Sequence, residues 1–165
     1  ILLFKNIKLL FLFYFLLFMS SCSLGNIKST IPEDLETLGS ITIESDNHRL
    51  SQIIKQNIEN SFIIYKGQSS EKKFILTFTL KEKIDSSFLT DSIRRISLYV
   101  NYKLYNINEE KVVLSGSFNL KSSLGPITSL FSREQSERNG LERLAISASE
   151  EIKLRLIEWA INRKA

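Results

Sequence analysis

Three segments of this chain alternate apolar and polar residues, and this pattern restricts the fold more than any other feature. Apolar residues recur at nearly every second position in residues 74–80, 96–104 and 112–120. A period of two places alternate side chains on opposite faces of a β-strand. Each segment has one apolar face and one mixed face, which is typical of an antiparallel sheet covered on one side.

The remaining segments predict a fourth strand, a helix and two connections. Residues 41–44 alternate as a short strand, and residues 48–62 carry apolar residues at helical spacing after the capping candidates Ser45, Asp46 and Asn47. Residues 106–110 are typical of a hairpin loop, and residues 83–92 of a longer, more mobile connection.

A long second helix is predicted at the end of the chain. Ser132 to Gln135 match a capping box, and an apolar stripe continues to about Asn162. Gly140 costs this helix about 1 kcal/mol relative to Ala and is a candidate for a bend. Since the helix is longer than a sheet is wide, we expect one end to project or to contact a partner.

The order β-α-β-β-β-α therefore predicts an α+β fold. We expect a two-layer sandwich in which two helices pack on one face of a mainly antiparallel four-stranded sheet.

Cys22, the only cysteine, indicates where this domain is held. It follows Lys5 and Lys8, an apolar run over residues 9–18 and a pair of small serines. This is the layout of a secretory signal, and a cysteine at the cut is typical of a bacterial lipobox. We predict that Cys22 is the lipidation site and carries an N-acyl diglyceride, as palmitate or a related acyl chain.

A plain signal peptide and a membrane anchor are the alternatives for this segment. The apolar run is short for a transmembrane helix, which needs about 20 apolar residues. A buried core helix fits poorly because the run has no polar face. The predicted organisation is a signal peptide over residues 1–21, a lipidated tether over residues 22–39 and a single domain over residues 40–165.

The composition gives little support for other function classes. Two of the 22 basic residues lie in the predicted signal, so the rest of the chain is nearly balanced and gives no case for nucleic acid. One cysteine allows no internal disulfide, and the single histidine, His48, is best explained as a surface residue. Glu109–Glu110 and Glu150–Glu151 are adjacent pairs whose side chains diverge. We predict no enzyme, no catalytic residue and no metal site.

The mixed face of the predicted sheet is the least ordinary surface. It combines basic, aromatic and hydroxyl side chains, namely Arg95, Tyr99, Lys103, Tyr105, Thr77, Thr79, Lys81, Ser115, Ser117 and Asn119. Such a face suits an anionic amphiphile or a polar protein partner, although an ordinary solvated face has the same composition.

The region after Cys22 resembles the lipopolysaccharide-assembly lipoprotein family LptE, particularly its alphaproteobacterial branch. The resemblance is carried by the lipobox cysteine, the strand at 41–43 with the helix at 49–62, the segment 93–104, and the segments 115–117 and 131–134. No single motif is specific to the family, so the resemblance depends on the order and spacing of these segments. Gly140 departs from the alanine-like residue expected there.

The resemblance implies a non-enzymatic lipoprotein on the periplasmic side of the cell outer membrane of a Gram-negative bacterium. It implies an LptD-like β-barrel as partner, which the protein plugs and helps to assemble, and lipopolysaccharide as ligand. Ser23 after the cysteine is compatible with outer-membrane sorting.

Three residues are the candidates for lipopolysaccharide contact: Arg94, Arg95 and Lys103. On a strand, Arg95 and Lys103 share one face and Arg94 points the other way. The alternative function is an auxiliary lipoprotein of a lipid-transporting ABC system, and a periplasmic hydrolase is the third class considered.

Overall fold

The computed structural model describes residues 33–65, 71–86, 94–125 and 129–163, which all belong to one compact unit spanning residues 31–165. The predicted signal peptide, Cys22 and the first part of the tether lie outside the described residues. The elements in chain order are α2 (Glu33–Gly39), β1 (Ile41–Glu44), α3 (Arg49–Phe62), the 3-10 helix η1 (Ile63–Tyr65), β2 (Phe74–Ser86), β3 (Arg94–Asn106), β4 (Lys111–Leu124) and α4 (Leu130–Asn162).

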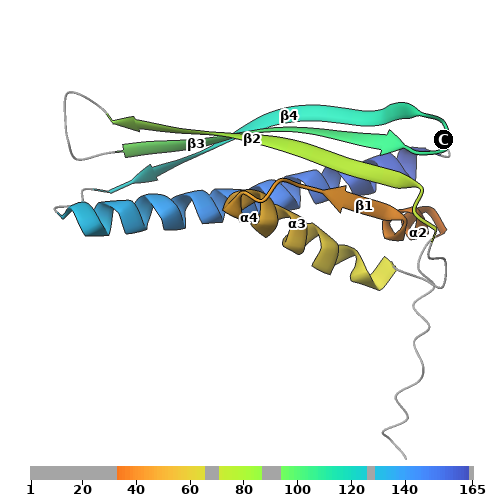
Figure 1. Ribbon diagram of the computed structural model, residues 1–165, viewed down its shortest axis with the longest axis horizontal. Helices are drawn as coiled ribbons and strands as arrows, with labels where there is room; N and C mark the ends of the chain where they lie inside the picture. Colours follow the sequence, from red (N-terminus) through yellow and green to blue (C-terminus); the bar gives the residue numbers. More distant parts are fainter. Residues whose placement is uncertain (1–32, 66–70, 87–93, 126–128, 164–165) are drawn as a thin grey trace, which may run out of the picture. The chain divides into compact units, whose positions relative to one another are not determined.

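The four strands form one sheet in the order β1-β2-β3-β4. β1 runs parallel to β2, and α3 forms the crossover that a parallel pair needs. The other two pairs are antiparallel. Figure 1 shows the helices on one side of this sheet. The predicted α+β class and the mainly antiparallel sheet are confirmed.

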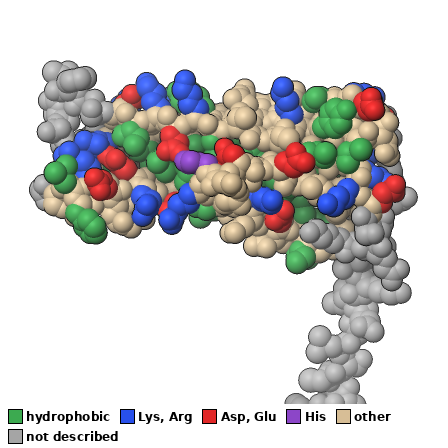
Figure 2. All heavy atoms as spheres, viewed as in Figure 1, with side chains coloured by type: hydrophobic (Ala, Val, Ile, Leu, Met, Phe, Trp, Pro, Cys, Tyr) green, Lys and Arg blue, Asp and Glu red, His purple; other side chains and the backbone are tan. Residues whose placement is uncertain are grey.

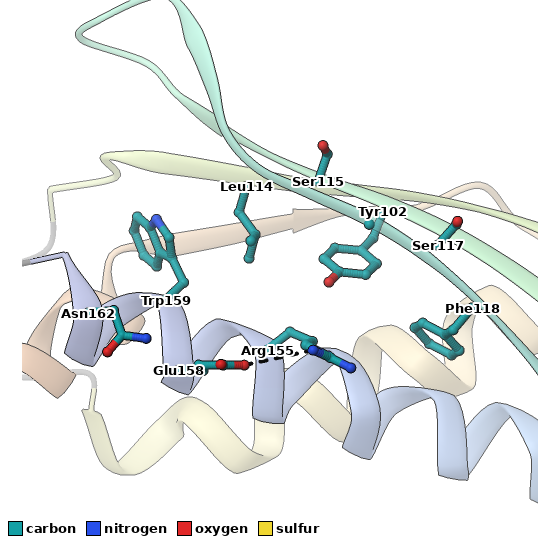
Figure 3. Close-up of a pocket in the computed structure, with 10 residues that line it drawn as sticks. Tyr102, Leu114, Ser115, Ser117, Phe118, Arg155, Glu158, Trp159 and Asn162 are labelled. Atoms are coloured by element: carbon teal, nitrogen blue, oxygen red, sulfur yellow. Dashed lines mark ion pairs between the residues drawn. The ribbon is translucent and has the colours of Figure 1, made fainter.

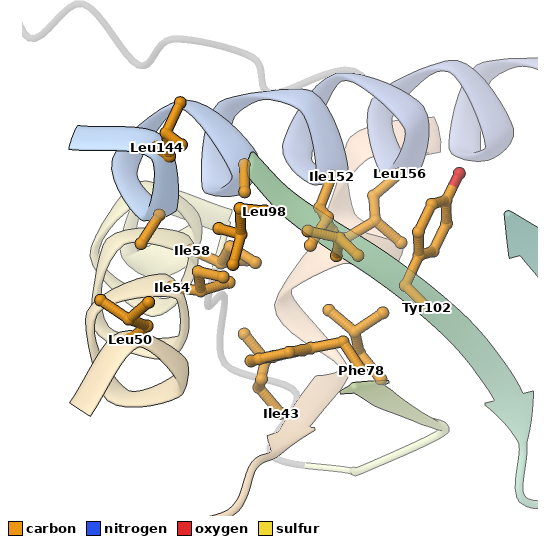
Figure 4. Packing of buried hydrophobic residues seen from close by; sticks show 14 of the residues in the cluster. Ile43, Leu50, Ile54, Ile58, Phe78, Leu98, Tyr102, Leu144, Ile152 and Leu156 are labelled. Carbon is orange, nitrogen blue, oxygen red and sulfur yellow. The ribbon is translucent and has the colours of Figure 1, made fainter. Parts of the chain in front are cut away.

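The core lies between the sheet and the helices (Figure 4). It is built from the apolar face of the strands and the inward stripes of α3 and α4, and its fully buried members include Ile54, Ile58, Leu76, Leu98, Val100 and Ile152. Because the strand pattern has a period of two, the opposite set of side chains is left on a face that the described helices do not cover.

Several predicted boundaries differ from the structure, since β3 and β4 also extend beyond residues 96–104 and 112–120. β2 continues through Lys83 to Ser86, where the sequence suggested a loop, because each of its residues keeps a partner on β3. α4 begins at Leu130, earlier than the Ser132 capping box predicts. Ser129 is the N-cap, and its side-chain oxygen accepts a hydrogen bond from the Ser132 backbone N–H at 3.1 Å.

The end of the predicted tether is folded instead. Residues 33–39 form α2, which contacts α4 and η1. Leu38 is fully buried and Leu35 packs against the core. Two leucines three positions apart lie on one face of a helix, so seven residues are enough to dock this segment.

Gly140 lies where α4 packs against side chains of β3 and β4. α4 is a single helix of 33 residues that includes it. A Cβ atom at Gly140 would lie 2.4 Å from Cδ1 of Ile96 and 3.2 Å from Cδ2 of Leu124. The glycine therefore lets the helix approach β3 and β4, a role that the sequence pattern did not suggest.

Candidate functional site: the open sheet face and the groove beside β4

The open face of the sheet is the surface that faces away from the helices. It is formed by alternate residues of β2, β3 and β4, namely Thr77, Thr79, Lys81, Lys83, Asp85, Arg95, Ser97, Tyr99, Asn101, Lys103, Ser115, Ser117, Asn119, Lys121 and Ser123. In Figure 2, Lys and Arg side chains stand along the upper edge of the molecule, which is the sheet side in Figure 1. The face is polar from Thr77 to Asp85 along β2, whereas Ile75, Tyr105 and the exposed Val112 make its other end partly apolar.

The strand register concentrates positive charge on one half of this face. Ser97 lies between Lys83 and Lys121, its direct partners on the two neighbouring strands. Tyr99, one step further along, has Lys81 as its partner on β2. Directly paired residues on one face have their Cβ atoms about 5 Å apart, so these lysines flank a short stretch of β3.

Acidic residues only partly offset this charge. Asp85 is the partner of Arg95 on β2, and its Oδ1 lies 3.0 Å from Nζ of Lys83. The hydrogen bond from Lys83 to Asp85 raises the pKa of that lysine, so it stays protonated well above neutral pH. Both side chains are about half exposed, so water screens the pair and leaves Lys83 accessible to an anion.

The three predicted contact residues do not form one patch. Arg94 faces the helix layer and pairs with Glu137 of α4, and both side chains are mostly buried. Arg95 is exposed on the open face, as is Lys103. Eight residues separate the latter two along β3, which corresponds to about 26 Å. The structure therefore separates all three residues from one another.

Two lysines on the cationic half of the face, Lys83 and Lys121, were missed by the sequence analysis as contact candidates. Lys83 was assigned to a loop, and Lys121 lies just past the predicted end of its strand. Both continue the alternation of the polar positions Lys81 and Asn119. Extending the alternating pattern further along each strand would have identified them. Their positions on either side of Ser97, however, depend on the strand register.

A groove of about 450 Å³ lies between the edge of β4 and the C-terminal half of α4 (Figure 3). Its strand side is formed by Tyr102, Leu114, Gly116 and Phe118, and its helix side by Arg155, Glu158, Trp159 and Asn162. Ser115 and Ser117 lie along its rim. The groove thus joins aromatic, aliphatic and charged groups beside the free edge of β4.

Tyr102 fills the space above Gly116, its direct partner on β4. A Cβ atom at Gly116 would lie 2.5 Å from the Tyr102 hydroxyl oxygen, so only glycine admits the ring there. Burial raises the pKa of Tyr102, which keeps the phenol neutral. In Figure 3 its hydroxyl points toward the helix side of the groove.

His48 and the acidic side chains are the candidates for metal binding in the part of the chain that the structure describes. No three His, Cys, Asp or Glu side chains of the described residues could hold a metal ion together. His48 lies at the surface 3.4 Å from Glu82, in an exposed ion-pair geometry. Nor do the described helices include one that is long and apolar enough to cross a membrane.

Comparison with solved structures gives the fold a precedent. A protein described as a lipoprotein from Caulobacter crescentus CB15 matches with a TM-score of 0.64 and 17% identity, over 79% of this chain and 98% of that one. The rare lipoprotein B from Shewanella oneidensis matches with a TM-score of 0.59 and 7% identity, over 76% of this chain and 97% of that one.

This chain has the fold of rare lipoprotein B, which is LptE. The likeness in fold bears out the resemblance drawn from the sequence. No protein-family model matches the sequence, and no curated protein matches it. At these identities the LptE-like likeness concerns the fold alone.

Proposed function

We propose that this protein is a lipid-anchored plug and assembly factor of an LptD-like outer-membrane β-barrel, and that it assists lipopolysaccharide insertion into the outer leaflet. The observation that carries the proposal is the open face of the sheet, which is polar over most of its length and rich in cations around Ser97. A plug in the polar interior of a barrel needs such a surface.

The length of the folded unit supports this role. α4 has 33 residues, and at the usual rise per residue it is about 50 Å long. The apolar band of an outer-membrane barrel is about 25 Å tall. A domain with a helix of this length can extend through the barrel interior and contact both of its rims.

Lipopolysaccharide fits the charge of the open face. Lys81, Lys83 and Lys121 lie around Ser97 and Tyr99, and Arg95 extends the same half of the face. Phosphate groups form short, strong hydrogen bonds with Lys and Arg. We assign this half of the open face, with Lys103 further along it, as the lipopolysaccharide contact surface.

The remaining parts of the proposal concern attachment. Cys22 would carry the acyl diglyceride that holds the protein on the periplasmic side of the outer membrane. The folded unit would act by binding, without enzymatic activity. In this proposal the lipid sets the location and the open face does the binding.

Extraction of membranes tests the proposal. Tagged protein is extracted in mild detergent, and we expect a large outer-membrane barrel to co-purify with it. A Cys22→Ala variant serves as the control for lipid-dependent delivery and should lose the barrel. Recovery of the tagged protein alone, from membranes in which other barrel complexes remain intact, would contradict the proposal.

The second candidate is an auxiliary lipoprotein of a lipid-transporting ABC system, which would also use a polar, cationic domain on a lipid anchor. Depletion separates the two. The barrel plug predicts lipopolysaccharide trapped before the cell surface. The ABC auxiliary predicts altered phospholipid traffic with normal surface lipopolysaccharide.

A further inference from the structure

The two free edges of the sheet differ in how they are protected. β1 pairs only with Phe74–Thr77 of β2, and the rest of β2 on that side carries alternating charges from Lys81 to Asp85. β4 forms the other edge, where the register shifts at Val113, and from Leu114 to Leu120 it contains no charged residue and no proline. Natural proteins block free edges with charges, prolines or bulges. The central part of β4 is therefore open to another strand.

The groove beside β4 gives an added strand a place for its side chains. Leu114, Gly116 and Phe118 face the groove, whereas Ser115 and Ser117 face the open side. A strand paired to β4 would direct every second side chain into this groove, between Phe118 and the helix (Figure 3). Edge pairing supplies affinity through backbone hydrogen bonds, and such a groove supplies specificity.

We propose that the occupant is a second copy of this chain, paired antiparallel along β4 about a two-fold axis at Ser117. In this register Gly116 lies opposite Phe118 of the other copy, and Leu114 lies opposite Leu120. On the open side Ser115 lies opposite Asn119. The strand is thus complementary to a second copy that runs in the opposite direction. The Phe118 ring of each copy lies opposite Gly116 of the other, and the two leucines pair on the groove side. No two residues of like charge lie opposite each other.

The helix beside this edge carries charges of both signs. Arg155 and Glu158 both line the groove. Arg155 pairs with Glu151 at 3.0 Å and only loosely with Glu158, at 3.8 Å, and the side chains of Arg155 and Glu158 are more than half exposed. The helix therefore adds no net repulsion at the edge, and the side-chain complementarity of β4 to itself carries the choice of a second copy.

This inference stands apart from the proposed function, since it concerns the protein when no barrel occupies the edge. Because the two copies would pair only through β4 and the adjacent surface of α4, we expect a dimer whose population rises with protein concentration. The Ser117 positions of the two copies would be directly opposed, with Cα atoms about 5 Å apart.

Cysteine cross-linking of the full-length lipoprotein in detergent tests the geometry. Ser117→Cys should form a disulfide-linked dimer on mild oxidation, because opposed Cα atoms fall within the usual range for a disulfide. Ser115→Cys alone should not, since its two copies would lie about 13 Å apart. Mixing Ser115→Cys with Asn119→Cys should restore the cross-link. The wild type, which keeps Cys22, gives the baseline.

Each result decides for or against the pairing. Cross-linking of Ser117→Cys and of the mixed pair, with a concentration-dependent dimer of the wild type by sedimentation velocity, supports it. Three results would overturn it: a monomer at all concentrations, equal cross-linking of Ser115→Cys alone, or an adduct of Ser117→Cys with a different protein in membranes.

Discussion

Gly140 and Gly116 set how closely large side chains approach the backbone in this fold. Each lies beneath a buried side chain, Ile96 in one case and Tyr102 in the other. In helix propensity alone, Gly140 is unfavourable. Its contact with β3 supplies the reason for its presence, because any Cβ there would enter the space of the Ile96 side chain.

Gly140→Ala should therefore destabilise the protein despite the better helix propensity of alanine. We expect the free energy of unfolding to fall by about 1 kcal/mol, since overpacking usually outweighs the propensity gain. Adding Ile96→Val removes the clashing Cδ1 atom. Urea unfolding of both single variants and the double variant should show a favourable coupling between the two changes. A stabilising Gly140→Ala would show that the contact is not tight.

Arg94 is expected to contribute to the stability of the fold and not to ligand binding. Because Arg94 and Glu137 pair in a mostly buried setting, Arg94→Gln should lower the free energy of unfolding by about 1–2 kcal/mol, between the values for exposed and fully buried pairs. Lipopolysaccharide binding by the folded variant should stay unchanged. Binding lost at full stability would return Arg94 to the contact surface.

At the scale of elements, the start of α4 separates two possible N-caps. Ser129→Ala should cost about 1 kcal/mol, because its side-chain oxygen accepts the hydrogen bond from the Ser132 backbone N–H. Ser132→Ala keeps that backbone donor and should cost much less. Chemical denaturation compares the two, and hydrogen exchange of the first turn should report the same order. A larger loss from Ser132→Ala would favour the later start.

α2 tests whether the segment before β1 is part of the folded unit. Leu38 is fully buried, so Leu38→Ala should lower the free energy of unfolding by about 2–5 kcal/mol. Glu36→Ala, an exposed change on the same helix, is the matched control and should have little effect. Equal, small effects of both changes would mean that residues 33–39 behave as the tether that the sequence predicted.

At the scale of the whole molecule, the open face can be tested by reversing its charge. The double change Lys83→Glu and Lys121→Glu should weaken lipopolysaccharide binding about tenfold or more, since two charge-assisted contacts of roughly 1 kcal/mol each are lost. Wild-type binding should also weaken as salt rises, because the sites are exposed. Binding can be followed by titration calorimetry on the full-length protein in detergent.

The matched control for this test carries the same charge change elsewhere. Lys55→Glu and Lys72→Glu alter α3 and the segment before β2, both outside the open face. We expect this variant to bind as the wild type does. If both double variants lose affinity equally, net charge rather than the open face determines binding.

The sequence alone determined the elements of this protein and the class of its fold. Alternation with a period of two, and apolar stripes at helical spacing, are local patterns, so β1, α3 and the three long strands could be read directly. The same patterns missed α2, because two leucines in seven residues are too weak a signal, and they shortened β2 where charged residues begin.

Only the tertiary structure decided which side chains meet. Arg94, Arg95 and Lys103 are all basic and belong to one predicted strand. In the structure Arg94 pairs with Glu137 of α4, whereas Arg95 and Lys103 lie far apart along β3. Lys83 and Lys121 are distant in sequence and meet across Ser97 because the register of two strand pairs aligns them. Register and helix packing are long-range properties, set by how all the elements bury their apolar faces together, and no local pattern contains them.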